Sequence, residues 1–132
     1  MTNQNTAPYA ALILRVSLGV LFLAHGALKL FVFTPAGTVG FFESLGLPGF
    51  FAYLTILAEV GGGAALIAGF ATRLVSIATL PILLGAVFLV HGANGWLYTN
   101  PNGGWEFPAF WAATLVVQAL LGDGAYAVRT PK

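Results

Sequence analysis

The sequence predicts an all-α integral membrane protein that folds as a four-helix bundle with up-down-up-down topology. Of its 132 residues, 58% are hydrophobic and only 7% are charged, whereas soluble domains average about 45–50% and about 25%. Four apolar segments are long enough to cross a bilayer core of about 30 Å, which takes roughly 20 residues of helix. They are residues 9–31, 48–70, 74–96 and 105–122. Together they predict one transmembrane domain, residues 9–122, between an N-terminal tail of residues 1–8 and a C-terminal tail of residues 123–132.

The links between these segments predict how the helices connect. Residues 71–73 are so few that the second and third segments should form an antiparallel hairpin. Residues 35–46 place aromatic side chains beside Glu43, which is typical of a short amphipathic helix at the membrane interface. An ordered loop fits these residues equally well. Residues 92–104 are rich in Gly, Asn and Pro and predict an exposed loop.

Composition also excludes several classes of protein. The net charge is +1 and there is no run of basic residues, so the chain offers nothing for nucleic-acid binding. There is no cysteine, which excludes disulfides, thiolate metal sites and iron–sulfur ligation within this chain. We expect no metal site, and any redox role must use a borrowed cofactor or a partner subunit.

The positive residues predict the orientation in the membrane. An even number of crossings places both termini on one side, together with Arg73, Arg129 and Lys132. The opposite side carries one lysine, Lys29, among acidic residues. Because positive residues concentrate on the cytoplasmic side, we expect both termini to be cytoplasmic.

Two segments of the chain resemble each other. Residues 19–27 and 85–93 share six identities in nine positions, 66 residues apart, in the first and third apolar segments. A duplicated helical hairpin explains this similarity, and chance likeness between Gly- and Phe-rich membrane helices is the alternative. Under duplication, His25 and His91 lie at equivalent depths.

Glu59 is the most unusual residue in the chain. It lies in an apolar stretch, residues 48–70, that carries no other charged side chain, and a carboxylate in that environment indicates function or an ion pair. At about 100° per residue, Arg15, His25 and Lys29 fall on one face of the first helix. At 1.5 Å rise per residue, Glu59 should lie midway in depth between Arg15 and His25, about 7–8 Å from each.

Two interpretations of Glu59 remain open. One is a structural ion pair with Arg15 that joins the first two helices. The other is a protonatable group at a quinone headgroup or in a proton path. His25 and His91 likewise serve either helix packing or a ligand or proton-relay site. Two histidines at one depth also suggest axial haem ligation, but such pairs occur often by chance, so we do not expect haem.

Glycines beside Glu59 predict close helix packing. The run Gly61, Gly62 and Gly63 removes side-chain bulk, so another helix can approach the backbone. A buried acid and a backbone contact are therefore expected in one place.

The order of these features resembles the DoxX family. The matching positions are Arg15, His25-Gly26 with Lys29, Gly46-Leu47-Pro48, Glu59 with Gly62 and Gly63, Gly69-x-x-Thr72-Arg73, and Gly122-x-Gly124. The resemblance spans residues 14–128, and the combination of Glu-x-x-Gly-Gly with Gly-x-x-Thr-Arg is its specific part. The family's usual ending, a small residue followed by Leu and Asp, is replaced here by Ala125-Tyr126-Ala127-Val128.

The resemblance implies a small multi-pass protein of the bacterial or archaeal plasma (inner) membrane. It implies an accessory subunit of a membrane oxidoreductase assembly that interacts with quinone and a redox partner subunit, although most members have no assigned reaction. The alternative is a non-catalytic scaffold or small-solute carrier whose buried polar residues stabilise the bundle. The sequence shows no recognisable set of nucleophile, base and metal ligands, so we do not expect the chain to be an enzyme by itself. Membrane lipid is an expected partner, and a homo-oligomer is compatible with the sequence.

The sequence therefore assigns two sets of residues. The candidate ligand or proton-relay site consists of Arg15, His25, Lys29, Glu59 and His91. The structural and packing set consists of Gly61, Gly62, Gly63, Gly69, Thr72 and Arg73.

Overall fold

The computed structural model describes residues 5–128, and within that range the secondary structure is helical without strands. The helices are α1 (Ala7–Ala27), continued by the π-helix η1 (Leu28–Val32); α2 (Thr34–Ser44); α3 (Phe50–Ala68); α4 (Thr72–Gly85), continued by the π-helix η2 (Ala86–His91) and the 3-10 turn η3 (Gly92–Asn94); and α5 (Glu106–Leu121). The predicted all-α class is confirmed. Arg129 and Lys132, which entered the prediction of orientation, lie outside the described residues.

Three helices are long and apolar enough to cross a membrane. They cover Ala7–Val32, Phe50–Ala68 and Thr72–Asn94. The fourth expected span is represented by α5, which has 16 residues and is shorter than the roughly 20 that a full crossing takes. It ends at Gly122, whose positive φ of 84° leaves the helical region. A fourth crossing therefore stays a prediction.

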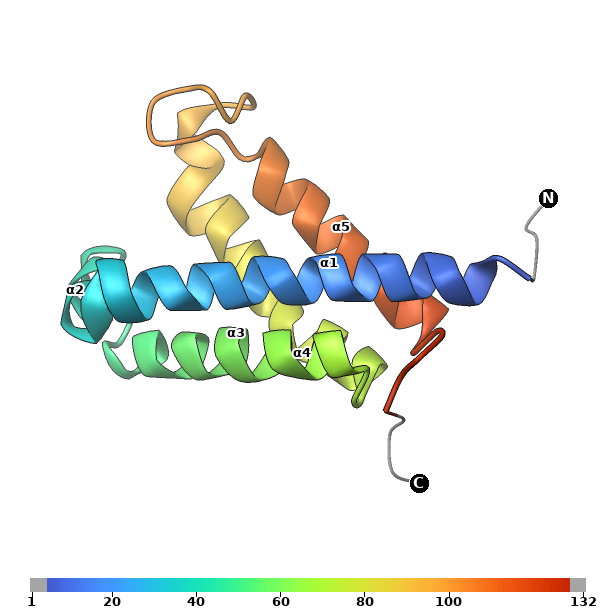
Figure 1. The fold of residues 1–132 in the computed structure, drawn as a ribbon. Helices are drawn as coiled ribbons and strands as arrows, with labels where there is room; N and C mark the ends of the chain where they lie inside the picture. Colours follow the sequence, from blue (N-terminus) through green and yellow to red (C-terminus); the bar gives the residue numbers. More distant parts are fainter. Residues whose placement is uncertain (1–4, 129–132) are drawn as a thin grey trace.

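The helices form two antiparallel pairs that cross each other obliquely. Figure 1 shows α1 lying along α3, while α4 and α5 run together at an angle to them. A bundle of four aligned helices, as the sequence predicts, is not confirmed. The hydrophobic core includes Leu18, Phe22, Leu66 and Leu115, which come from both pairs and are almost completely buried.

Glycines bring α1 and α3 into backbone contact. A Cβ atom on Gly63 would lie 2.9 Å from the carbonyl oxygen of Gly19, and one on Gly19 would lie 2.7 Å from that of Gly63. Small residues allow membrane helices to approach this closely. The contact sets the register of the first pair.

Residues 34–44 form the helix that the sequence suggested between the first two spans. α2 follows directly after η1, and its first residue, Thr34, has φ of +66°. This conformation is unusual for a β-branched residue. The chain turns there from α1 into α2, at one end of the first pair (Figure 1). The position of α2 at a membrane interface stays a prediction.

Candidate functional site

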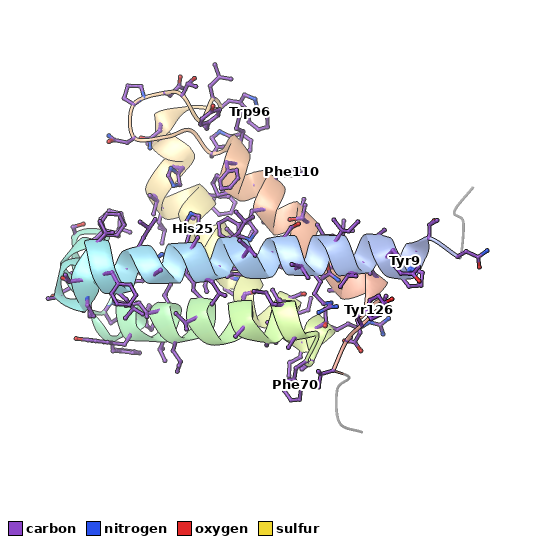
Figure 2. All side chains as sticks on the ribbon, viewed as in Figure 1. Tyr9, His25, Phe70, Trp96, Phe110 and Tyr126 are labelled. Atoms are coloured by element: carbon purple, nitrogen blue, oxygen red, sulfur yellow. The ribbon has the colours of Figure 1, made fainter. Side chains whose placement is uncertain are left out.

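A cavity of about 840 Å³ lies between the two helix pairs. α1, η1, α2 and α3 line one side of it, and α4, η2 and α5 line the other. Most of the lining is apolar, with aromatic side chains from α2, α3 and α5. Four of the five candidate site residues also line it: His25, Lys29, Glu59 and His91. Figure 2 shows His25 on α1 where the second pair crosses it in the view.

Lys29 and Glu59 form an ion pair at this cavity. Lys29 Nζ lies 2.8 Å from Glu59 Oε1, and the side chains are 19% and 3% exposed. At this distance the ammonium group neutralises the buried carboxylate. The partner of Glu59 is therefore Lys29 and not Arg15, and the expected Arg15–Glu59 pair is wrong.

The register of α1 against α3 explains this pairing. A Cβ atom on Gly26 would lie 3.4 Å from the Cβ of Glu59, so Glu59 lies at the level of Gly26 rather than midway toward Arg15. Arg15 lies about 16 Å from Gly26 along the helix axis, at 1.5 Å per residue, which is beyond its reach. Side chains on a helix point toward its N-terminus, so Lys29 extends back to the level of Glu59.

Arg15 instead joins three chain segments away from the cavity. Its side chain is completely buried and donates to the carbonyl oxygens of Leu66 and Ile67 on α3, at 2.8 and 2.7 Å. It also donates to the carbonyl oxygens of Asp123 and Ala125, at 3.0 and 2.9 Å. The last carbonyl groups of a helix lack intrahelical partners. The planar guanidinium supplies partners to the end of α3 and holds the C-terminal segment against it.

The segment of residues 122–128 is therefore part of the packed structure. Ala125 N donates to Pro8 O at 3.0 Å, and Val128 N donates to Ala68 O at 2.9 Å. Gly124 has φ of +74°, and a Cβ atom there would lie 2.7 Å from Pro8 O, so only glycine fits this close approach. These contacts give the Gly-x-Gly ending a structural role that the sequence did not indicate.

Hydrogen bonds determine the tautomer of both cavity histidines. His25 Nδ1 lies 2.9 Å from Leu21 O, and His91 Nδ1 lies 2.9 Å from Gly103 O. A carbonyl oxygen can only accept, so each Nδ1 must carry the hydrogen. In the neutral ring, Nε2 is then a hydrogen-bond acceptor. Within residues 5–128 neither Nε2 atom has a hydrogen-bond partner.

Trp111 is a cavity residue that the sequence analysis did not single out. It is 5% exposed, and its ring meets that of His25 edge-on at a centroid distance of 4.8 Å. Its Nε1 is buried and has no partner among the described residues, although a buried indole N–H is usually paired. One feature of the sequence could have indicated its role. Trp111 lies in the middle of an apolar segment, away from the membrane interfaces where tryptophan is enriched.

Two site residues lie in π-helical segments, which the sequence did not predict either. Lys29 belongs to η1, and His91 ends η2. π-helical turns are rare and occur often at functional sites. Both turns border the cavity, one on each side.

The three consecutive glycines of α3 differ in what they contact. A Cβ atom on Gly63 would meet the backbone of α1, and one on Gly62 would lie 3.1 Å from Thr79 on α4. A Cβ atom on Gly61 would meet nothing within 4 Å among the described residues. The glycine run therefore serves packing at two of its three positions.

The other packing residues lie at the turn between α3 and α4. Gly69 ends α3 with φ of +80°, and Thr72 begins α4 in a completely buried position. The guanidinium of Arg73 lies against Gly122, 3.0 Å from where a Cβ atom would be. This turn therefore packs against the end of α5.

The chemical capacity of the cavity follows from the groups that border it. It offers the ion pair, two imidazole acceptors and the hydroxyl of Thr55 in apolar surroundings. Within residues 5–128 no three His, Cys, Asp or Glu side chains are grouped closely enough to hold a metal ion. The arrangement is suited to a neutral apolar molecule with a few polar atoms.

Comparison with known proteins identifies related chains. The family model described as DoxX matches residues 10–92. The chain is 32% identical over 125 residues to "Inner membrane protein YqjF" of Escherichia coli (strain K12), covering 89% of this chain and 87% of that one. It is 40% identical over 79 residues to "Putative oxidoreductase CatD" of Bacillus subtilis (strain 168), covering 60% of this chain and 58% of that one. No solved structure matches.

Proposed function

The chain belongs to the DoxX family, and from that premise we propose that it is an accessory subunit of a membrane oxidoreductase assembly that holds a quinone-type headgroup. The headgroup would occupy the cavity between the two helix pairs. The similarity to the relative named "Putative oxidoreductase CatD" supports the redox association. No residue is assigned a catalytic role, and the chemistry would belong to the bound molecule and the partner subunit.

The observation that carries this proposal is the cavity itself. If Glu59 and the histidines only packed the helices, they would contact one another directly with no space between them. Instead Glu59, His25 and His91 border a volume of about 840 Å³, within the range of about 300–1,000 Å³ that holds small organic ligands. Its aromatic and aliphatic lining suits a ring with an apolar tail.

The proposed location rests on composition and on similarity. Three helices are long enough to cross a membrane, and a relative that matches 89% of this chain is named as an inner membrane protein. We therefore propose a multi-pass inner membrane protein with both termini in the cytoplasm. Ala125 N donates to Pro8 O at 3.0 Å, so the two ends of the described chain lie side by side, which supports a common side for both.

The test is native mass spectrometry of the protein extracted gently from its own membrane. We expect a co-purifying quinone or quinol, a second protein subunit, and no haem. Gly85 lines the cavity, and a Cβ atom there would meet nothing within 4 Å. Gly85→Leu should therefore place an apolar side chain in the cavity and reduce the amount of co-purifying quinone.

A second glycine supplies the matched control. A Cβ atom on Gly61 also meets nothing within 4 Å, but Gly61 is exposed and does not line the cavity. Gly61→Leu should retain the quinone. If the parent protein carries neither quinone nor partner, the redox proposal is wrong and the scaffold or carrier alternative takes its place.

A further inference from the structure

We infer that the cavity selects the reduced, dihydroxy form of a quinone over the oxidised dione. This inference rests on the proposed function and adds the redox state of the ligand. It follows from the hydrogen-bonding roles of the polar atoms that border the cavity, three of which can only accept.

The first two acceptors are the histidines. Their Nδ1 atoms donate to Leu21 O and Gly103 O, so both rings in the neutral state present Nε2 as an acceptor. Neither Nε2 is among the sealed polar atoms that lack a partner, and neither has a hydrogen bond within residues 5–128. Each Nε2 is therefore accessible and unpaired within the described chain. Both histidines line the cavity, one from each helix pair.

The third acceptor is Glu59. Its Oε1 faces Lys29 Nζ at 2.8 Å and is sealed from solvent. Its other oxygen, Oε2, is not among the sealed atoms and has no hydrogen-bond partner among the described residues. A carboxylate oxygen only accepts, so this atom adds an acceptor that a ligand can reach.

The donors that a ligand can reach are Lys29 Nζ and the hydroxyl of Thr55, which lines the cavity and has no side-chain hydrogen bond within residues 5–128. The Nε1 of Trp111 has no partner within the described chain, but it is sealed in the same way as Glu59 Oε1, so a ligand in the cavity does not reach it. Lys29 Nζ carries three hydrogens, and its ion pair with Glu59 leaves some of them for a ligand. A ligand oxygen must accept from these donors and also supply a hydrogen to an acceptor, and the two hydroxyl groups of a quinol can pair two of the three acceptors.

Only a hydroxyl group meets both requirements. A quinone carbonyl oxygen can accept from Lys29 or Thr55, but it leaves the two imidazoles and the carboxylate unpaired. A quinol hydroxyl both accepts and donates. Sites that hydrogen-bond a ligand hydroxyl discriminate strongly against the analogue that lacks it, because the polar groups of the site are then left unpaired.

The experiment compares the two redox forms on the same protein. Purified full-length protein in lipid nanodiscs is titrated under anaerobic conditions with decylubiquinol and, separately, with decylubiquinone, using isothermal titration calorimetry. We expect the quinol to bind at least about tenfold more tightly, because the cavity groups are only partly enclosed and the discrimination is below that of a fully enclosed site.

Variants then identify the acceptors. His25→Phe and His91→Phe keep a ring in place but remove Nε2, so each should weaken quinol binding while changing quinone binding by less than about threefold. Leu89 lines the same cavity without a polar group. Leu89→Ala is the control and should weaken both forms equally.

The outcomes separate this inference from the proposed function. If quinone binds as tightly as quinol or more tightly, the inference is overturned while the proposed quinone site stands. If neither form binds, the proposed function fails together with the inference. The comparison on the parent protein decides the inference even if a histidine variant does not fold.

Discussion

Lys29 and Glu59 illustrate, for single residues, how burial determines pairing. Glu59 is 3% exposed, and Lys29 Nζ lies 2.8 Å from its Oε1. A buried ion pair stabilises the fold mainly in comparison with a single buried charge that has no partner. The pair is therefore expected to matter most when one partner is removed.

The first prediction concerns Lys29→Met. This change leaves the Glu59 carboxylate without its cation, and we expect it to lower the free energy of unfolding by about 2 kcal/mol, below the roughly 3–5 kcal/mol of fully buried pairs because Lys29 is 19% exposed. The measurement is unfolding by SDS titration in mixed micelles. The double variant Lys29→Met with Glu59→Gln should recover most of the loss. Parent-like stability of the single variant would show that the pair does not stabilise the fold.

The second prediction concerns Arg15, which donates to four carbonyl oxygens. Arg15→Lys keeps the charge but replaces a planar fork by a compact ammonium that cannot reach all four. We expect a loss of about 2–3 kcal/mol of stability, the value of one or two charge-assisted hydrogen bonds. Hydrogen exchange at the amides of Ala125 and Val128 should accelerate.

The control for Arg15 is another arginine. Arg73 is exposed and lies against Gly122. Arg73→Lys should change neither stability nor exchange in the C-terminal segment by a measurable amount. Equal effects of the two substitutions would contradict the special role of Arg15.

Among the helices, backbone contacts between α1 and α3 place the site residues. The mutual approach of Gly19 and Gly63 fixes the register that brings Glu59 level with Gly26. The π-helical turn η1 then continues α1 and carries Lys29. The ion pair is thus a consequence of how two helices meet.

The third prediction tests this contact with Gly63→Ala. The new Cβ atom would lie 2.9 Å from Gly19 O, a backbone atom that can move only with its helix. We expect the helices to separate at a cost of about 1–3 kcal/mol. SDS titration measures it, and Gly61→Ala, whose Cβ atom meets nothing within 4 Å, should be neutral or slightly stabilising. A Gly63→Ala protein as stable as Gly61→Ala would contradict the close contact.

In the molecule as a whole, the cavity depends on both helix pairs. His25, Lys29 and Glu59 come from the first pair, and His91 and Trp111 come from the second. Neither pair surrounds the volume alone. The oblique crossing of the pairs in Figure 1 brings these residues to one cavity from helices that are far apart in sequence.

The fourth prediction concerns orientation. The chain contains no cysteine, so a single introduced cysteine reports its own position without background. Ser44 and Tyr126 are both exposed, at the end of α2 and in the C-terminal segment. A membrane-impermeant maleimide should label Ser44→Cys on intact cells, whereas Tyr126→Cys should react only after lysis. Labelling of Tyr126→Cys on intact cells would reverse the orientation.

Much of the fold was accessible from sequence because it depends on composition and local pattern. Long apolar segments must be helical in lipid, where every backbone group needs an internal partner. The all-α class follows from such local rules. So does the family, since its motifs are stretches of consecutive residues. At residues 34–44 the local pattern fitted a helix and a loop equally well, and the structure has the helix. The antiparallel hairpin expected for the second and third segments is not confirmed, because α4 runs with α5 at an angle to α3 (Figure 1).

The pairing of the site residues could not be predicted from the sequence in the same way. Periodicity placed Lys29 and His25 on one helix face, and both line the cavity. The partner of Glu59, however, depends on the register between two helices, which the Gly19–Gly63 contact sets. Counting residues along each expected helix placed Glu59 midway in depth between Arg15 and His25, which is too near the level of Arg15.

Composition and motifs are enough to establish a helical membrane protein of one family that carries a costly buried acid. The packing of the helices determines that Arg15 holds the C-terminal segment, that Lys29 neutralises Glu59, and that Trp111 shares a cavity with both histidines. The physical reason is the distance along the chain over which each interaction acts. Helix formation depends on neighbours in sequence, whereas charge pairing and cavity formation depend on distances of a few ångströms between helices.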